Sequence, residues 1–216
     1  MDSKKIALIG GTGFVGQAVL DELLSRGHQV TALARHPDKL PARPGLRVVQ
    51  GDAQVISEVQ QAVEGSEMVV SAYNPGHGLP DIQAQFIQGS RAIVAGVKAA
   101  GVPRLLVVGG AGSLFVTPDV QLVDTPEFPA EWKEGALGAR QALRDLQAET
   151  VLDWTFVSPA MMLEPGERTG TYRLGQDTPL MTGDGPGRIS TADLAVAIVD
   201  EVEQARHPRQ RFTLAY

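Results

Sequence analysis

The stretch Ile9-Gly10-Gly11-Thr12-Gly13-Phe14-Val15-Gly16 decides the fold of this chain. Its spaced glycines lie between an apolar run and an amphipathic helical pattern. Such a loop lets the backbone N–H groups at the start of a helix approach a pyrophosphate, which larger residues would block. The pattern therefore predicts a dinucleotide-binding loop; the alternative is a tight strand–helix turn that binds another ligand. The residues expected to contact the dinucleotide here are Gly10, Thr12, Gly13, Phe14, Val15 and Gly16.

Outward from this loop, apolar runs alternate with helical patterns. Strands are expected at 6–9, 30–34, 46–49, 68–72, 104–108, 154–157 and 211–214, and helices at 14–26, 55–63, 81–100, 131–149 and from 190 onward. The strand centres are apolar, as in strands that are buried on both faces and joined by right-handed crossovers. We predict the α/β class: a Rossmann-type doubly wound, mostly parallel sheet flanked by helices, in one domain over 1–216. Residues 118–129 are expected as a polar loop, and about 159–190 as a small irregular C-terminal substrate region.

Composition excludes several kinds of site and partner. The chain has no cysteine, and therefore no disulfide, thiolate nucleophile or Cys-ligated metal. The four histidines, at 28, 36, 77 and 207, lack a His-x-x-x-His spacing, so no metal site is expected. The formal net charge of −6 gives no reason to bind nucleic acid or an anionic membrane. No segment approaches the roughly 20 apolar residues of a membrane span. We expect a cytoplasmic monomer or homodimer whose partner is a small molecule.

The end of the second expected strand indicates which dinucleotide binds. NAD-specific sites commonly have an Asp or Glu there that holds the ribose 2′-hydroxyl, but this chain has Ala34-Arg35-His36. Arg35 can form a forked, charge-assisted contact with a 2′-phosphate, and Lys39 is a second cation nearby. We therefore predict NADP as the cofactor, with NADPH preferred over NADH. The alternative is that Arg35 is a solvated surface side chain.

Seven segments, spread in order over essentially the whole chain, carry a resemblance. They are Ile6 to Gly16, Gly51-Asp52, residues 109–114 (Gly-Gly-Ala-Gly-Ser-Leu), 153–155 (Asp-Trp-Thr), Ser158-Pro159, 170–172 (Gly-Thr-Tyr) and 189–195 (Ile-Ser-Thr-Ala-Asp-Leu-Ala). In this combination the chain resembles the atypical short-chain dehydrogenase/reductase group called NADH-flavin reductases. That group is similar to biliverdin reductase B and, more distantly, to NmrA-like proteins. The resemblance implies fold and cofactor more strongly than substrate.

The resemblance also assigns roles to two further loops. In the short-chain dehydrogenase superfamily an Asp after the third strand lies near the adenine amino group, which implies that role for Asp52, with Ala53 beside it. Asp after Gly is also a common turn residue, so the turn is the alternative. Ala72, Tyr73 and Asn74 follow the fourth expected strand. We expect their backbone to pass beside the nicotinamide-side ribose.

One departure from the wider superfamily bears on the chemistry. Its ordinary members use a Ser with a Tyr-x-x-x-Lys pair, in which the Tyr moves a proton and the Lys lowers the pKa of that Tyr. Ser113 matches the serine, but Trp132 and Ala136 stand where the Tyr and Lys are expected. The loss argues against alcohol oxidation, epimerisation and dehydration, which need a positioned proton carrier. It leaves hydride transfer to a flat conjugated acceptor, such as a flavin, quinone or linear tetrapyrrole, that stabilises the added charge itself.

On this interpretation Ser113 hydrogen-bonds the acceptor and Lys133 assists electrostatically; the alternatives are a structural serine and a solvated lysine. The acceptor is expected to contact residues near the carboxyl ends of the strands, namely Leu114, Trp132, Pro159 and Met161. Three functions remain open. They are an NADP(H)-dependent reductase, an NmrA-like dinucleotide sensor without catalysis, and a sugar-nucleotide epimerase or dehydratase, which the missing pair and the short chain oppose.

Overall fold

The strand–loop–helix unit predicted from the glycine pattern opens the fold. The computed structural model describes residues 3–76, 78–183 and 185–216, so His77 lies outside the described residues. The first strand, β1 (Lys5–Ile9), is buried from its second residue onward and leads into the glycine loop and α1 (Phe14–Ser25). Because the apolar side chains of α1 recur every three or four residues, they form one face that packs on the sheet.

The central sheet has eight strands in the order β10-β14-β8-β5-β4-β1-β2-β3. Neighbouring strands are parallel except β10 and β14. Around β1 the order is that of doubly wound dinucleotide-binding folds, in which the connections reverse direction between β1 and β4. The bounds of the other strands are β2 (Gln29–Ala34), β3 (Leu46–Gln50), β4 (Met68–Ser71), β5 (Arg104–Val108), β8 (Asp153–Ser158), β10 (Arg173–Gly175) and β14 (Gln210–Ala215).

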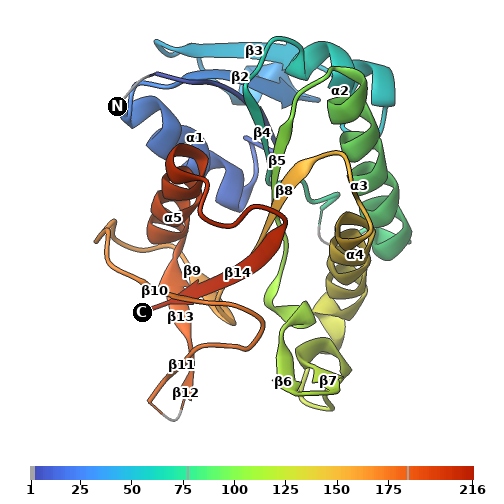
Figure 1. The fold of residues 1–216 in the computed structure, drawn as a ribbon, viewed down its shortest axis with the longest axis vertical. Helices are drawn as coiled ribbons and strands as arrows, with labels where there is room; N and C mark the ends of the chain where they lie inside the picture. The colour runs from blue at the N-terminus through green and yellow to red at the C-terminus, as the bar shows by residue number, and fades with distance from the viewer. Residues whose placement is uncertain (1–2, 77, 184) are drawn as a thin grey trace.

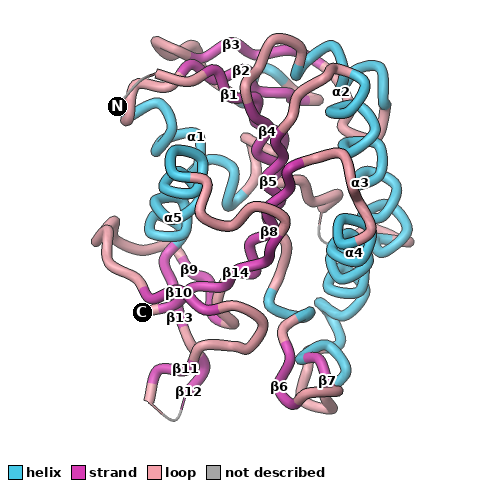
Figure 2. Tube along the Cα trace, viewed as in Figure 1, coloured by secondary structure: helices cyan, strands magenta, loops and turns pink. Residues whose placement is uncertain are grey.

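Helices cover both faces of this sheet (Figure 1). One face carries α1 and α5 (Thr191–Gln204), and the other carries α2 (Ile56–Val63), α3 (Ile82–Ala99) and α4 (Ala130–Gln147). Successive strand residues alternate between the two apolar cores, so that Leu8 packs toward α1 and α5 while Ile9 packs toward α2 and α3. Figure 2 shows the strands as a column between the two helix layers. The predicted Rossmann-type α/β fold is confirmed. No helix in the described ranges is long and apolar enough to cross a membrane.

Two segments differ from the sequence expectation. The expected loop at 118–129 overlaps a hairpin of β6 (Phe115–Thr117) and β7 (Val120–Gln121) and a short 3-10 turn, η3 (Leu122–Asp124). The irregular region contains β9 (Met162–Glu164), β11 (Met181–Thr182), β12 (Gly185–Pro186) and β13 (Arg188–Ser190), and its β10 joins the main sheet. Strands of two or three residues are too short to show an alternating pattern, so sequence periodicity misses them. Two further 3-10 turns are η1 (Pro37–Lys39) and η2 (Ala111–Ser113).

The irregular C-terminal region is fixed to α5 and α1 by polar contacts. Ser190 caps α5 by accepting the Asp193 N–H. The buried Asp193 carboxylate accepts hydrogen bonds from the Thr169 hydroxyl at 2.6 Å and the Gly170 N–H at 2.7 Å. The Arg168 guanidinium donates to Glu22 of α1. These contacts give a segment with few apolar residues a defined position.

Candidate dinucleotide and acceptor site

Four segments singled out by the sequence lie at the carboxyl ends of adjacent strands. Because the strand order is β3-β2-β1-β4, the loops after these strands lie side by side. Backbone hydrogen bonds join them: the Gly51 N–H donates to the Ala34 carbonyl at 3.1 Å, and the Ala72 N–H donates to the Ile9 carbonyl at 2.9 Å. The structure thus brings together the glycine loop and the segments around Arg35, Asp52 and Ala72.

The glycines of the loop meet different structural requirements. Gly10 has φ +85°, and a Cβ there would lie 2.4 Å from the Ala72 carbonyl oxygen. A Cβ on Gly16 would lie 1.9 Å from the Gly10 carbonyl oxygen. Gly13 has φ −87°, and the nearest atom to its Cβ would be the Gly10 oxygen at 3.3 Å. Packing therefore requires Gly10 and Gly16, whereas the exposed Gly13 keeps open the space in front of the helix.

The start of α1 suits a phosphate. Gly13 is its N-cap and makes no side-chain cap, so the first N–H groups of the helix stay available. The first turn contains no acidic residue that would oppose an anion. Thr12 and Val15 are half-buried, and Phe14 is 56% exposed. These features fit the pyrophosphate of a dinucleotide.

Charged and phenolic groups meet beside this loop. Burial raises the pKa of the Tyr73 phenol; the Asp52 charge raises it further, while a Gln54 hydrogen bond and the Arg35 charge oppose the rise. Arg35 and Asp52 therefore both lie close enough to Tyr73 to affect its ionisation. Arg35 is exposed at the end of β2, so its guanidinium can turn toward a ligand.

Tyr73 itself is bound tightly to protein groups. Its ring packs on Gly89 of α3, where a Cβ would lie 2.3 Å from the ring. Its hydroxyl donates to the Gln85 carbonyl at 3.1 Å and accepts from the Gln54 side-chain amide at 3.1 Å. The side chain thus holds the loop after β4 against α3. The backbone contact with a dinucleotide that we predict for 72–74 is compatible with this arrangement.

Asp52 lies in a turn. Its carboxylate accepts the Gln54 N–H at 2.9 Å, and its own N–H donates to Glu58 Oε2 at 2.6 Å. Ala53 is buried, while Asn74 is exposed and accepts the Gly76 N–H at 2.9 Å. Glu58 is missing from the sequence-based site. Glu58 is the third residue of α2. Glu at this position commonly accepts from backbone N–H groups that precede the helix, so its place in the sequence could have indicated this contact.

The loop after β5 presents its backbone rather than its serine. Ser113 is 2% exposed, and its Oγ accepts a hydrogen bond from Arg211 Nη1 at 3.1 Å. Leu114 is fully buried. Residues 109–111 are half-buried and form the accessible part of the loop. Sequence reasoning also missed Arg211, although an arginine within an otherwise apolar final strand is an available signal.

The first turns of α4 lie against this loop. A Cβ on Gly112 would lie 2.9 Å from the Cβ of Ala136, which stands where the superfamily has its lysine. Trp132 is 55% exposed, and Lys133 is exposed beside it. The structure therefore places Trp132 and Lys133 on the surface while the Ser113 hydroxyl is buried. Of the other predicted acceptor residues, Pro159 is buried and Met161 is half-buried.

Comparisons with known proteins agree with the fold and with a dinucleotide-binding loop. The sequence profile of the NAD(P)H-binding family matches residues 10–205. The Bacillus subtilis protein YwnB is 38% identical over 213 residues, which are 97% of each chain. A Bacteroides thetaiotaomicron structure, provisionally named an epimerase, has a TM-score of 0.93 and 42% identity over 100% of this chain and 98% of its own. A Streptococcus pneumoniae structure, provisionally named an NADH-flavin reductase, has a TM-score of 0.84 and 33% identity over 99% of each chain.

Proposed function

Since the chain belongs to the NAD(P)H-binding family, we propose that this NAD(P)H-dependent oxidoreductase is an NADPH-preferring reductase of a flat conjugated acceptor, such as a flavin or quinone. The observation that carries the proposal is the start of α4. An exposed indole, Trp132, and a small side chain, Ala136, stand there in place of a proton-donating Tyr and its Lys. An acceptor that stabilises the added electrons in its own rings does not need that pair.

The described residues fit the proposed cofactor. The N–H groups at the start of α1 bind the pyrophosphate, and Arg35 binds the 2′-phosphate. Asp52 and Ala53 border the adenine, and the backbone of 72–74 borders the nicotinamide-side ribose. When bound, the reduced nicotinamide supplies the hydride. The work of the chain is to hold this end of the dinucleotide at the carboxyl edge of the sheet, where open α/β sheets bind their ligands.

The surface that we assign to the acceptor, around Trp132 and Met161, combines a flat aromatic ring with few polar groups. The exposed Trp132 ring offers a face for stacking, and Lys133 beside it favours an acceptor that gains negative charge. Met161 supplies apolar contact beyond the end of β8, and the buried Pro159 supports it from below. Ser113 orients the acceptor indirectly: its carbonyl and its Oγ both accept from Arg211, and these contacts hold in place residues 109–111, the accessible part of the loop.

The tyrosines of the chain support the same interpretation. All three hydroxyls donate to protein oxygens: Tyr73 to the Gln85 carbonyl, Tyr172 to Asp200 and Tyr216 to Asp193. A phenol committed in this way is poorly placed to protonate a substrate. The provisional name of the Streptococcus pneumoniae protein is in line with the proposal. That of the Bacteroides thetaiotaomicron protein implies a reaction that needs a proton carrier.

Steady-state oxidation of NADPH and NADH, with FMN, riboflavin and menadione as separate acceptors, tests the proposal. We expect turnover with at least one acceptor and a higher kcat/KM for NADPH. Gly13→Val is the matched control for background reduction. Tight NADPH binding without turnover of any flat acceptor would replace the reductase with a dinucleotide sensor.

A further inference from the structure

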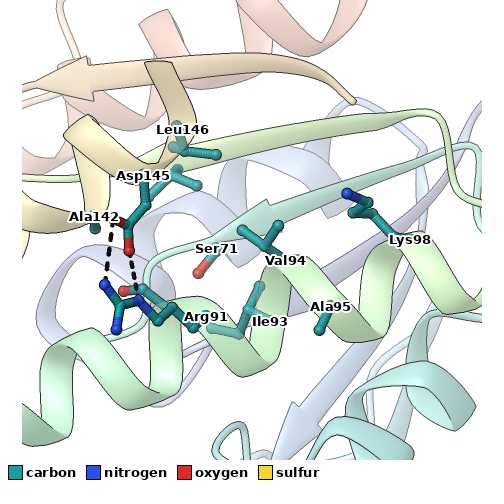
Figure 3. A pocket seen from close by; sticks show the side chains of 11 residues that line it. Ser71, Arg91, Ile93, Val94, Ala95, Lys98, Ala142, Asp145 and Leu146 are labelled. Carbon is teal, nitrogen blue, oxygen red and sulfur yellow. Dashed lines mark hydrogen bonds and ion pairs between the residues drawn. The ribbon is translucent and has the colours of Figure 1, made fainter. Parts of the chain in front are cut away.

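A cavity of about 400 Å³ lies between α3 and α4 (Figure 3). Small residues at the contact between the two helices leave the space: Ala95 on α3 and Ala142 on α4 line it. Most of the wall is apolar, with Val94, Val107 and Leu146 among its members. The glycine loop and the loops after β2 and β3 contribute nothing to this lining. Only Ser71, which precedes the segment 72–74, brings the cavity close to the proposed dinucleotide site.

Charges around the cavity are neutralised in pairs. Arg91 of α3 donates to Asp145 of α4, with Nε and Oδ2 2.7 Å apart. Lys98 of α3 lies 2.9 Å from Glu149, just beyond the end of α4. Figure 3 shows the Arg91–Asp145 pair at one end of the cavity and Lys98 at the other. Because each cation near the opening has an anionic partner, the site favours a neutral occupant.

Two hydroxyl groups line the cavity: Ser90 of α3, which is half-buried, and Ser71, which is the more deeply buried. Ser71, the last residue of β4, lines it and is 2% exposed. Its Oγ accepts only a long contact of 3.4 Å from the Tyr73 N–H, so it can accept a better-placed donor from a ligand. A small number of polar groups within a mostly apolar wall is the usual means by which a small-molecule pocket orients its ligand.

We propose that this cavity binds a neutral, largely apolar molecule of one or two fused rings, with Ser71 as its deep hydrogen-bond partner. The volume lies within the range of about 300–1,000 Å³ that is common for small-molecule sites. A second copy of the chain fits less well. Among the described residues, α3 has no exposed large hydrophobic side chain and α4 has only Trp132 in its first turn. A stable interface buries roughly 800 Å² on each partner around an apolar centre.

Binding of 5-fluoroindole, followed by ¹⁹F NMR, tests the proposal. The probe is neutral, has two fused rings and carries one N–H that can reach Ser71. We expect saturable binding to the wild-type protein, and at least ten-fold weaker binding to Ala95→Phe, which fills the cavity. Ala84→Phe is the matched control, because Ala84 is an exposed residue of the same helix and does not line the cavity. It should bind the probe like the wild type.

Ser71→Ala provides a second test that does not depend on overfilling the core. It should weaken 5-fluoroindole about three- to ten-fold and leave 5-fluorobenzothiophene, which has no N–H, unchanged. Non-saturable signals, or equal affinity in the wild type and a folded Ala95→Phe variant, would overturn the proposal. So would sedimentation of a wild-type dimer that Ala95→Phe dissociates, because the groove would then belong to a second copy. Titration of the wild type and the same variants with NADPH tests the dinucleotide site independently. Failure of the cavity proposal can therefore be distinguished from failure of the proposed reductase function.

Discussion

Arg211 holds Ser113 by two oxygens: its Nη1 donates to the Ser113 carbonyl at 2.8 Å and to the Ser113 Oγ at 3.1 Å. Both residues are buried, and Asp177 balances the guanidinium charge through a hydrogen bond of 2.9 Å from Nε. The final strand therefore fixes the loop after β5. The carbonyl contact does not depend on the hydroxyl, so the loop keeps one of its two bonds to Arg211 when the hydroxyl is removed.

Ser113→Ala should consequently lower kcat/KM by only about 10- to 100-fold, the effect of about 1.4–2.7 kcal/mol for one lost positioning hydrogen bond. Stopped-flow reduction of FMN or menadione by NADPH measures this value, and circular dichroism checks that the variant is folded. A loss of a thousandfold or more would mean that the hydroxyl takes part in the chemistry.

Arg35→Ala should weaken NADPH binding by roughly 1.5–3 kcal/mol and leave NADH binding nearly unchanged, because the lost charge-assisted contact is to the 2′-phosphate. Fluorescence titration of both dinucleotides measures the effect. Arg47→Ala, at an exposed arginine of β3, is the matched control for a general loss of positive charge. Equal affinity of the wild type for NADPH and NADH would contradict the proposed preference.

Gly13→Val should abolish dinucleotide binding while the protein stays folded. The Gly13 backbone lies in an ordinary region of φ, and a Cβ there meets the loop at 3.3 Å, so the new side chain projects mainly into the ligand space. Gly16→Ala is the contrasting variant. Its Cβ would lie 1.9 Å from the Gly10 oxygen, and it should lose stability in thermal unfolding. Retained NADPH binding by Gly13→Val would show that the loop serves another purpose.

The sequence predicts well those parts of the fold that periodic burial controls. The strand ending at Ile9 and the helix starting at Phe14 are where the pattern places them, because an apolar run and a glycine turn leave few alternatives. The exposure of the predicted site residues depends instead on long-range partners. Ser113 is buried because Arg211, 98 positions later, binds it. The Tyr73 hydroxyl is engaged because α3 packs beneath it. No local pattern carries that information.

Asp193→Asn should lower the free energy of unfolding at neutral pH. It should also make that free energy fall less steeply as the pH is lowered. Burial raises the pKa of Asp193, but hydrogen bonds from Thr169, Gly170 and Tyr216 outweigh it and bring the pKa below its ordinary value. A carboxyl whose pKa is lowered in the folded state stabilises that state above the unfolded pKa of about 3.9, and this contribution is lost as the pH falls through the folded pKa.

Urea unfolding at pH 7 and at steps from pH 5 to pH 3 measures this contribution. We expect Asp193→Asn to cost about 1–3 kcal/mol at pH 7 and to show a smaller change toward pH 3 than the wild type. Asp119→Asn, at an exposed aspartate in the turn of the β6–β7 hairpin, is the control and should unfold like the wild type. An acid dependence that is the same in Asp193→Asn and the wild type would assign the effect to other carboxyls.

The rate of menadione reduction should show no phenolic step between pH 7 and pH 10. Of the three tyrosines, only Tyr73 belongs to a loop that we assign to the dinucleotide. Burial raises its pKa, and its hydroxyl proton is committed to the Gln85 carbonyl. It is therefore poorly suited to give a proton to an acceptor in this range. Menadione has no group that titrates in this pH range, so stopped-flow rates at saturating NADPH report the titration of the protein alone.

Tyr73→Phe should keep the flat pH profile and lose about 1 kcal/mol of stability because its hydrogen bonds are removed. A step in the wild type that Tyr73→Phe removes would make this phenol the proton donor and overturn the donor-free mechanism.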